Sequence, residues 1–189
     1  LTLIFGLALA IERIIYLNLS TTNTGKLLNK VESALETGGV EKAKEVCKNT
    51  RGPVAGIFYQ GLDRYNEGIE IVEKSIVGYG SVLMGRLESG LSWIALFIAL
   101  APMLGFMGTV IGMIQAFDDI AAAGDISPTI VASGIKVALL TTVFGLIVAI
   151  ILQIFNNYIV SKIDSLVNNM EDSSISFIDI LTKYKASNK

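Results

Sequence analysis

Residues 101–117 read APMLGFMGTVIGMIQAF, and they lie within an uncharged run of 27 residues from Leu91 to Phe117. A helix needs about 20 apolar residues to cross the hydrocarbon core of a bilayer, so this run predicts a membrane-spanning helix. Its small residues recur every three or four positions, which places them in one narrow stripe on the helix. The stripe consists of Ala101, Gly105, Gly108, Thr109, Gly112 and Ala116.

A second stretch repeats this pattern 33 residues later, and Thr-Val-x-Gly occurs in both stretches. Lipid supplies no hydrophobic force between helices, so stripes of small residues favour close backbone packing. Two interpretations are open: the stripes pack helices within one subunit, or part of them lines a pore at a symmetric interface. The matching register makes the pore our working hypothesis. The second stripe consists of Gly134, Ala138, Thr141, Thr142, Gly145 and Ala149.

The composition indicates an integral membrane protein with a polar portion. Of 189 residues, 52% are hydrophobic and 17% are charged, whereas a soluble domain has about 25% charged residues. The chain has no histidine and one cysteine, Cys47, which excludes His-based metal sites, Ser-His triads and a disulfide framework. The net charge of −2 argues against nucleic-acid binding. We therefore expect no metal, no cofactor and no enzymatic activity.

We expect an all-α membrane protein with three transmembrane helices, from which long helices extend into a cytoplasmic helical domain. Residues 1–17 are interpreted as the end of a truncated first transmembrane helix; a cleaved signal peptide is disfavoured because no small-residue cleavage site follows Ile11. Residues 18–90 form amphipathic helices, the first capped by Thr24 and ended by Gly38-Gly39, and the last continues unbroken into the membrane. The other predicted segments are transmembrane helices 91–117 and 129–160, a periplasmic loop 118–128, and a cytoplasmic helix and tail 161–189.

The charge distribution predicts the orientation. The loop 118–128 carries Asp118, Asp119 and Asp125 and no lysine or arginine, whereas residues 18–90 carry nine basic residues and the tail after Val160 carries four. The positive-inside rule places the basic segments in the cytoplasm. We therefore expect a bacterial inner-membrane protein, surrounded by membrane lipids, with a periplasmic N-terminus and a cytoplasmic C-terminus.

Thr109 and Thr142 are the polar candidates within the membrane. A membrane threonine usually donates to the carbonyl one turn back without further function, but these two lie on the same edge of the small stripe. Lys136 is the only ionisable residue between Ser127 and Val160; it lies opposite the stripe and can snorkel to the outer interface. The chain thus has no carboxylate at membrane depth, so a moving proton needs an acid from another chain.

The chain resembles the ExbB/TolQ/MotA family of proton-channel subunits over most of its length. Three crossings and the short length resemble the ExbB/TolQ branch. The matching segments are APMLGFMGTVIGMIQAF (101–117), Ser127-Pro128, GIKVALLTTVFGLIVAI (134–150), Asn156-Asn157-Tyr158 and GPVAGIFYQGL (52–62).

The resemblance implies a homopentamer whose second and third membrane helices line a central pore. A dimer of an ExbD- or TolR-like single-span partner would lie inside the pore and carry the proton on an aspartate. Proton flow would drive a TonB- or TolA-like protein and so energise outer-membrane transport. Thr109 and Thr142 match the family's pore threonines, whereas Val137 stands where ExbB proteins often have glutamate, so no role of that glutamate is carried over. The alternatives are a TolQ-type subunit for envelope maintenance and a non-conducting membrane scaffold.

Overall fold

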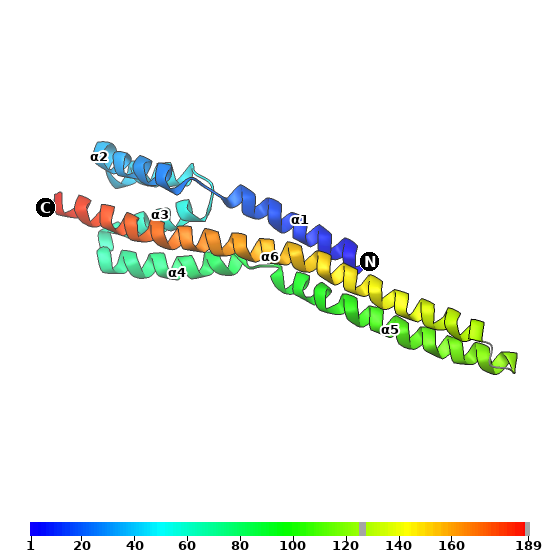
Figure 1. The fold of residues 1–189 in the computed structure, drawn as a ribbon. Helices are drawn as coiled ribbons and strands as arrows, with labels where there is room; N and C mark the ends of the chain where they lie inside the picture. The colour runs from blue at the N-terminus through cyan, green and yellow to red at the C-terminus, as the bar shows by residue number, and fades with distance from the viewer. Residues whose placement is uncertain (125–127, 188–189) are drawn as a thin grey trace. The chain divides into compact units, whose positions relative to one another are not determined.

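The computed structural model describes residues 1–124 and 128–187, and these consist of helices joined by short turns (Figure 1). No strand occurs in the described ranges, which agrees with the all-α prediction. The chain consists of two compact units. The helices are α1 (Thr2–Ser20), α2 (Thr24–Lys48), α3 (Pro53–Asp63), the 3-10 helix η1 (Tyr65–Glu67), α4 (Ile69–Leu87), α5 (Leu91–Ala123) and α6 (Pro128–Ser187).

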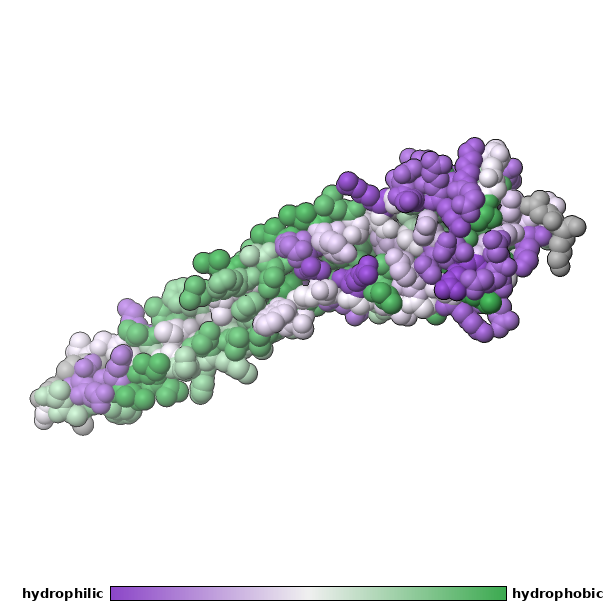
Figure 2. Space-filling view, turned by 180° about the vertical axis from the view of Figure 1, so that it is seen from behind, coloured by the Kyte–Doolittle hydropathy of each residue, from purple (hydrophilic) through white to green (hydrophobic). Residues whose placement is uncertain are grey.

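The apolar unit comprises residues 1–13 and 90–159, and its outer surface is hydrophobic. Figure 2 shows this as the green surface over α1, α5 and the first half of α6. Phe106, Phe144 and Ile154 are each more than half exposed, which is unfavourable in water and favourable against lipid chains. The three helical segments that contain α1, α5 and α6 are long and apolar enough to cross a membrane, as the sequence predicts.

Helix α1 packs on both partners of this unit. The ring of Phe5 on α1 stacks on Phe97 of α5, with 6.4 Å between the ring centroids. Gly6 lies so close to α6 that a Cβ atom there would come within 2.7 Å of Leu152 Cδ1. Ala10 and Leu152 are fully buried. The three apolar helices are therefore held together by side-chain packing rather than by charges.

The polar unit comprises residues 14–89 and 160–189 and has an ordinary hydrophobic core. At its centre, Phe58 of α3 and Phe177 of α6 are fully buried and stack with 4.3 Å between ring centroids. Gly61 allows this contact, because a Cβ atom there would lie 2.8 Å from Phe177 Cε1. The surrounding buried residues come from every long helix of the unit, and they include Leu27, Val31, Leu35, Ile57, Leu62, Val72, Ile76 and Leu181.

Helix α6 is one uninterrupted helix of 60 residues and supplies side chains to both units. At about 1.5 Å per residue it is roughly 90 Å long, about three times the thickness of a bilayer core. Beyond the apolar segment, an apolar seam runs along α6: Ile159, Ile163, Leu166 and Met170 are buried, and Phe155 is half-buried. The seam then continues to Phe177 and Leu181.

The prediction that the last helix of the 18–90 segment continues unbroken into the membrane is wrong. Helix α4 ends at Leu87 and α5 begins at Leu91. Gly90 between them has φ of 86°, in the left-handed region, where residues other than glycine are strained. Two consecutive helices therefore replace the single long one, although no proline separates them.

The loop predicted at residues 118–128 begins later in the structure than predicted. Helix α5 continues through Asp118 and Asp119 to Ala123 and ends at Gly124, whose φ of 67° forms a left-handed C-cap. Charged residues end an apolar stretch, but they do not by themselves end a helix. Residues 125–127, and with them Asp125, lie outside the described ranges, as does the end of the tail at 188–189.

Two further helix ends differ in detail. Helix α1 ends at Ser20, three residues beyond the predicted end at residue 17. The cap of α2 is Asn23 rather than Thr24: the Asn23 side-chain oxygen accepts a hydrogen bond of 3.0 Å from the backbone N–H of Lys26. The predicted break at Gly38-Gly39 is present as a kink, with non-helical angles at Gly39.

Candidate functional site

The stripes of small residues on α5 and α6 face one another within the chain. A Cβ atom added at Gly105 would lie 3.0 Å from the carbonyl oxygen of Thr141, and one added at Gly145 would lie 2.6 Å from the carbonyl oxygen of Ala101. A Cβ atom at Gly112 would lie 3.0 Å from that of Ala138. The two backbones therefore approach as closely as glycine allows.

This close approach brings three threonine hydroxyls around one backbone carbonyl. The Oγ1 atoms of Thr141 and Thr142 on α6 each lie 3.2 Å from the carbonyl oxygen of Gly105 on α5. The hydroxyl of Thr109 lies 3.4 Å from the same oxygen. Thr109 Oγ1 and Thr142 Oγ1 are 2.9 Å apart and share a hydrogen bond across the helix pair.

The number of hydroxyl protons determines which further hydrogen bonds these three threonines can form. Thr141 has a second acceptor, the Ala138 carbonyl at 2.7 Å. Each hydroxyl has one proton and two lone pairs, so Thr109 and Thr142 together use one proton between them and one towards Gly105. Three of their four lone pairs remain. The pair can thus accept a hydrogen bond at once, but it can donate one only by giving up the bond to Gly105.

Packing inside the chain accounts for most of the residues predicted to form the small stripe. Some are buried between the helices and others are half-buried at the edge of the contact. Thr109 and Thr142 belong to this half-buried edge. The fully buried set is Ala101, Gly105, Gly112, Ala116 and Ala138, and the half-buried set adds Gly108, Gly134, Thr141, Gly145 and Ala149.

The only ionisable side chain along the third apolar segment, Lys136, lies apart from the threonines. It is exposed in a shallow depression that it shares with Leu139, Leu140 and Val143, none of which belongs to the small stripe. Val137, beside it, is 57% exposed. The threonine pair therefore has no charged neighbour from its own two helices. Among the described residues no group of three His, Cys, Asp or Glu side chains is placed to bind a metal.

Two features of this site were not predicted. The Gly105 carbonyl is the common acceptor of the threonines, and no residue pattern identifies a backbone acceptor on another helix. Further along α6, the side-chain nitrogen of Gln153 donates to Asn157 Oδ1 over 2.9 Å. These residues are four apart and exposed, so their pairing could have been inferred from helical spacing.

Outside the apolar helices, the perturbed titrating groups belong to the core and the surface of the polar unit. Burial raises the pKa of the Cys47 thiol to about 12. The pKa of Lys44 is raised, first by its hydrogen bond to Glu41, which is 3.1 Å away, and also by Asp63. Desolvation raises the pKa of Tyr65. Lys44 and Cys47 lie on α2, and Tyr65 lies on η1.

Comparison with known proteins identifies relatives over most of the chain. Residues 49–172 match the MotA/TolQ/ExbB proton channel family. The chain is 34% identical to a biopolymer transport protein ExbB homolog of Methanothermobacter thermautotrophicus over 89% of its own length and 60% of that protein. It is 41% identical to biopolymer transport protein exbB1 of Vibrio cholerae, over 34% of the chain and 29% of that protein. The chain thus spans less than two thirds of either relative.

Proposed function

The chain belongs to the MotA/TolQ/ExbB proton channel family, and from this membership we propose that it is an inner-membrane proton-channel subunit. With an ExbD-like partner it converts the proton motive force into mechanical work on a TonB-like protein, which energises outer-membrane transport. The family is one of proton channels rather than of enzymes, and several relatives are named as biopolymer transport proteins. The hydroxyl pair Thr109–Thr142, which is half-buried at the edge of the contact between two apolar helices, is the observation that carries the proposal.

In the proposed mechanism the threonine pair receives a carboxyl group from the partner. Between Leu91 and Phe117 there is no ionisable residue, and in the third apolar segment there is only Lys136. A carboxyl group in lipid has to be neutral or closely hydrogen-bonded. The threonine hydroxyls offer such bonds without titrating themselves.

The threonine pair does not hydrogen-bond equally well to the two protonation states of that carboxyl group. A protonated carboxylic acid donates to one of the three free lone pairs of Thr109 and Thr142, and no existing bond is broken. A carboxylate instead needs a hydroxyl proton, which has to leave the Gly105 carbonyl. The pair therefore favours the neutral acid, which is the form that can cross an apolar region.

The assembly follows from the same proposal. Five copies surround a central pore that contains a dimer of the single-span partner, and the half-buried edge of the α5–α6 contact faces this pore. The glycines hold α5 and α6 of each copy at a fixed spacing. The acidic end of α5, with Asp118 and Asp119 exposed, faces the periplasm, and the polar unit lies in the cytoplasm.

Proton flux through the complex tests the proposal. The full chain is reconstituted with an ExbD-like partner in liposomes, and flux is measured with an internal pH dye under an imposed proton gradient. Thr142→Val keeps the side-chain shape and removes the hydroxyl; we expect flux to fall about tenfold, the effect of one hydrogen bond to a charged or ionising group. Thr142→Ser keeps the hydroxyl and should keep the flux, and the same pair of variants applies at Thr109.

The controls separate this function from its alternatives. Replacing the partner's membrane aspartate by asparagine should abolish flux, and unchanged flux would contradict the proposal. A non-conducting scaffold predicts no flux in any variant and no dependence of function on the proton gradient. A TolQ-type subunit predicts flux together with an envelope defect, rather than an uptake defect, when the gene is deleted.

A further inference from the structure

The polar unit contains a small cavity of about 220 Å³ that the proposed channel does not use. Its walls come from the end of α1, the start of α3 and the last turns of α4. The polar side chains that line it are Tyr16, Ser20, Tyr79 and Arg86, and none of its lining residues is acidic. It is thus a cavity with one permanent positive charge and several hydroxyl groups.

The floor of this cavity is a closely packed junction of two segments. The Thr22 hydroxyl donates to the Arg51 carbonyl and so ties the segment after α1 to the segment before α3. Gly52 has φ of 114° and lies against Thr22 and the Ser20 carbonyl, where a Cβ atom would collide. The floor therefore has little room to rearrange.

One wall is formed by an aromatic ring seated on a glycine. A Cβ atom at Gly56 of α3 would lie 3.3 Å from Tyr79 Cε1 and 3.5 Å from the Tyr79 hydroxyl oxygen. The ring edge and hydroxyl of Tyr79 thus lie against Gly56 of α3. Both residues line the cavity, so the absence of a side chain at Gly56 positions this hydroxyl.

Arg86 supplies the charge. It is exposed, it lies in the last turn of α4, and among the described residues it forms no ion pair. An arginine guanidinium matches the oxygens of a phosphate in a two-pronged geometry. The Ser20 hydroxyl donates to the Tyr16 carbonyl over 2.9 Å. With the Tyr79 hydroxyl beside Arg86 and no carboxylate in the lining, the cavity suits a phosphate-bearing anion.

The position along the chain indicates the source of that phosphate. On the continuous helix α1, Tyr16 and Ser20 follow the apolar stretch that ends at Ile11 by about 8 and 14 Å, at 1.5 Å per residue. The headgroup zone extends roughly 5–8 Å beyond each face of the hydrocarbon core. Arg86 likewise precedes the first residue of α5, Leu91, by five positions. Measured along α1, the cavity therefore comes within reach of the headgroup zone at Tyr16.

We propose that the cavity lined by Arg86, Tyr79, Tyr16 and Ser20 binds the phosphate headgroup of an anionic phospholipid of the adjoining leaflet. Its volume is below the roughly 300–1,000 Å³ of sites that enclose a whole small molecule, so it holds a headgroup while the acyl chains stay in the bilayer. The site requires only that the apolar helices lie in a membrane, and it does not depend on proton flow.

Lipid retention by the full chain tests this proposal. The protein is placed in nanodiscs of equal parts phosphatidylcholine and phosphatidylglycerol, released, and examined by native mass spectrometry for the ratio of the two lipids that stay bound. We expect a preference for phosphatidylglycerol that falls about tenfold in Arg86→Gln, the effect of one charge-assisted hydrogen bond. Tyr79→Phe, which removes only the hydroxyl, should lower it by roughly fivefold.

Lys162→Gln is the matched control. Lys162 follows the predicted end of the third apolar segment by two residues and is absent from the cavity lining, so its loss removes one positive charge near the same leaflet. Equal losses in Arg86→Gln and Lys162→Gln would mean general attraction to an anionic surface and would overturn the proposal. Loss of the lipid preference when inorganic phosphate is added would also overturn it, because the cavity would then select a free anion.

Discussion

Gly145→Ala tests the close α5–α6 contact on which the threonine pair depends. The added Cβ atom would lie 2.6 Å from the Ala101 carbonyl oxygen and 3.1 Å from Gly105 Cα, both of them backbone atoms. Ordinary contact begins at 3.4 Å, so the helices have to separate by about 0.8 Å at this point. Overpacking of this kind costs about 1–3 kcal/mol.

The same movement breaks the hydrogen bonds of the site. The Thr142–Gly105 distance of 3.2 Å would grow to about 4.0 Å, and the Thr109–Thr142 distance of 2.9 Å to about 3.7 Å, both too long for a hydrogen bond. Such bonds contribute about 0.6 kcal/mol each within membranes. We therefore expect Gly145→Ala to lower the free energy of unfolding by about 2–4 kcal/mol.

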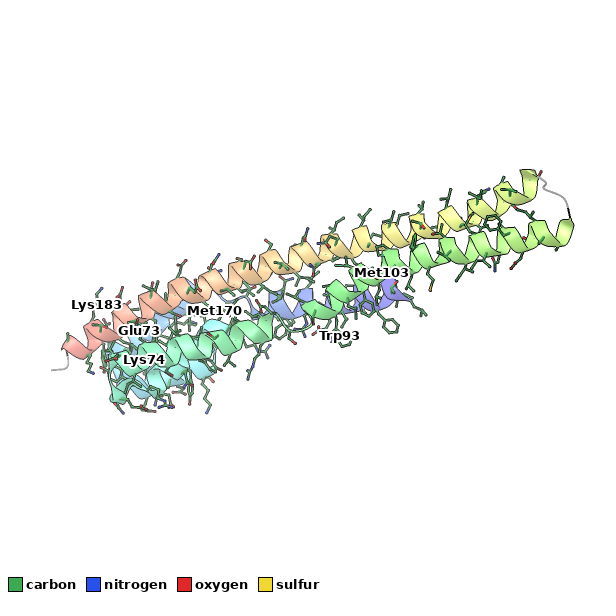
Figure 3. All side chains as sticks on the ribbon, turned by 90° about the horizontal axis from the view of Figure 1, so that it is seen from below. Glu73, Lys74, Trp93, Met103, Met170 and Lys183 are labelled. Atoms are coloured by element: carbon green, nitrogen blue, oxygen red, sulfur yellow. The ribbon has the colours of Figure 1, made fainter. Side chains whose placement is uncertain are left out.

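Unfolding in mixed micelles of increasing dodecyl sulfate measures this effect, with the fluorescence of Trp93, the only tryptophan and a residue of α5 (Figure 3), as the signal. Gly78→Ala on α4 is the control, because no atom lies within 4 Å of its added Cβ atom; it should stabilise its helix by up to about 1 kcal/mol. Gly108→Ala should also destabilise the protein, by about 1–3 kcal/mol, because its added Cβ atom would lie 2.8 Å from the Cβ atom of the β-branched Thr141. A Gly145→Ala protein as stable as the wild type would refute the close contact.

Three further changes have definite expected results. Phe177→Ala removes one of two stacked, fully buried rings and should lower the free energy of unfolding by about 3–5 kcal/mol in thermal melts followed by circular dichroism, whereas Ile175→Ala, at a residue 63% exposed, should change it by less than about 0.5 kcal/mol. Because burial raises the pKa of Cys47 from 9.0 to about 12, maleimide labelling at pH 8 should be slow in the folded protein and fast after denaturation. The contribution of the buried neutral thiol to the free energy of unfolding is complete below pH 9 and declines as the pH rises from 9 towards 12. Thr141→Val should leave proton flux near that of the wild type, because the Thr141 hydroxyl is already paired with Ala138 and is not part of the Thr109–Thr142 bond; a loss as large as that of Thr142→Val would contradict the assignment of the pair.

Hydropathy and periodicity predict the helices well, since both depend on neighbouring residues. The uncharged run from Leu91 predicts α5, and the regular seam from Ile159 to Met170 predicts that α6 continues beyond the bilayer. The break at Gly90 was missed, because no proline marks it and the apolar pattern resumes directly afterwards. The Ser89-Gly90 pair, which directly follows the charged residues Arg86 and Glu88, is the signal that could have identified the break.

The partner of a helix face is harder to predict than the face itself. Spacing places Gly105 and Thr109 on one stripe of α5, and Thr142 on one stripe of α6, but it does not indicate which of several packing arrangements is formed. A bond between Thr142 and the Gly105 carbonyl also depends on the axial offset of the two helices. That offset is determined by where Gly145 meets Ala101 and Gly112 meets Ala138, and these contacts appear only in three dimensions.

Left-handed glycines bound α5 at both ends, whereas α1 and α6 each continue through the boundary between the two units. Gly90 thereby separates α5 from α4. Within the apolar unit, Gly105, Gly112 and Gly145 bring the backbone of α5 directly against α6. A force on Thr109 would therefore pass from α5 to α6 through backbone contacts, which yield less than flexible side chains do.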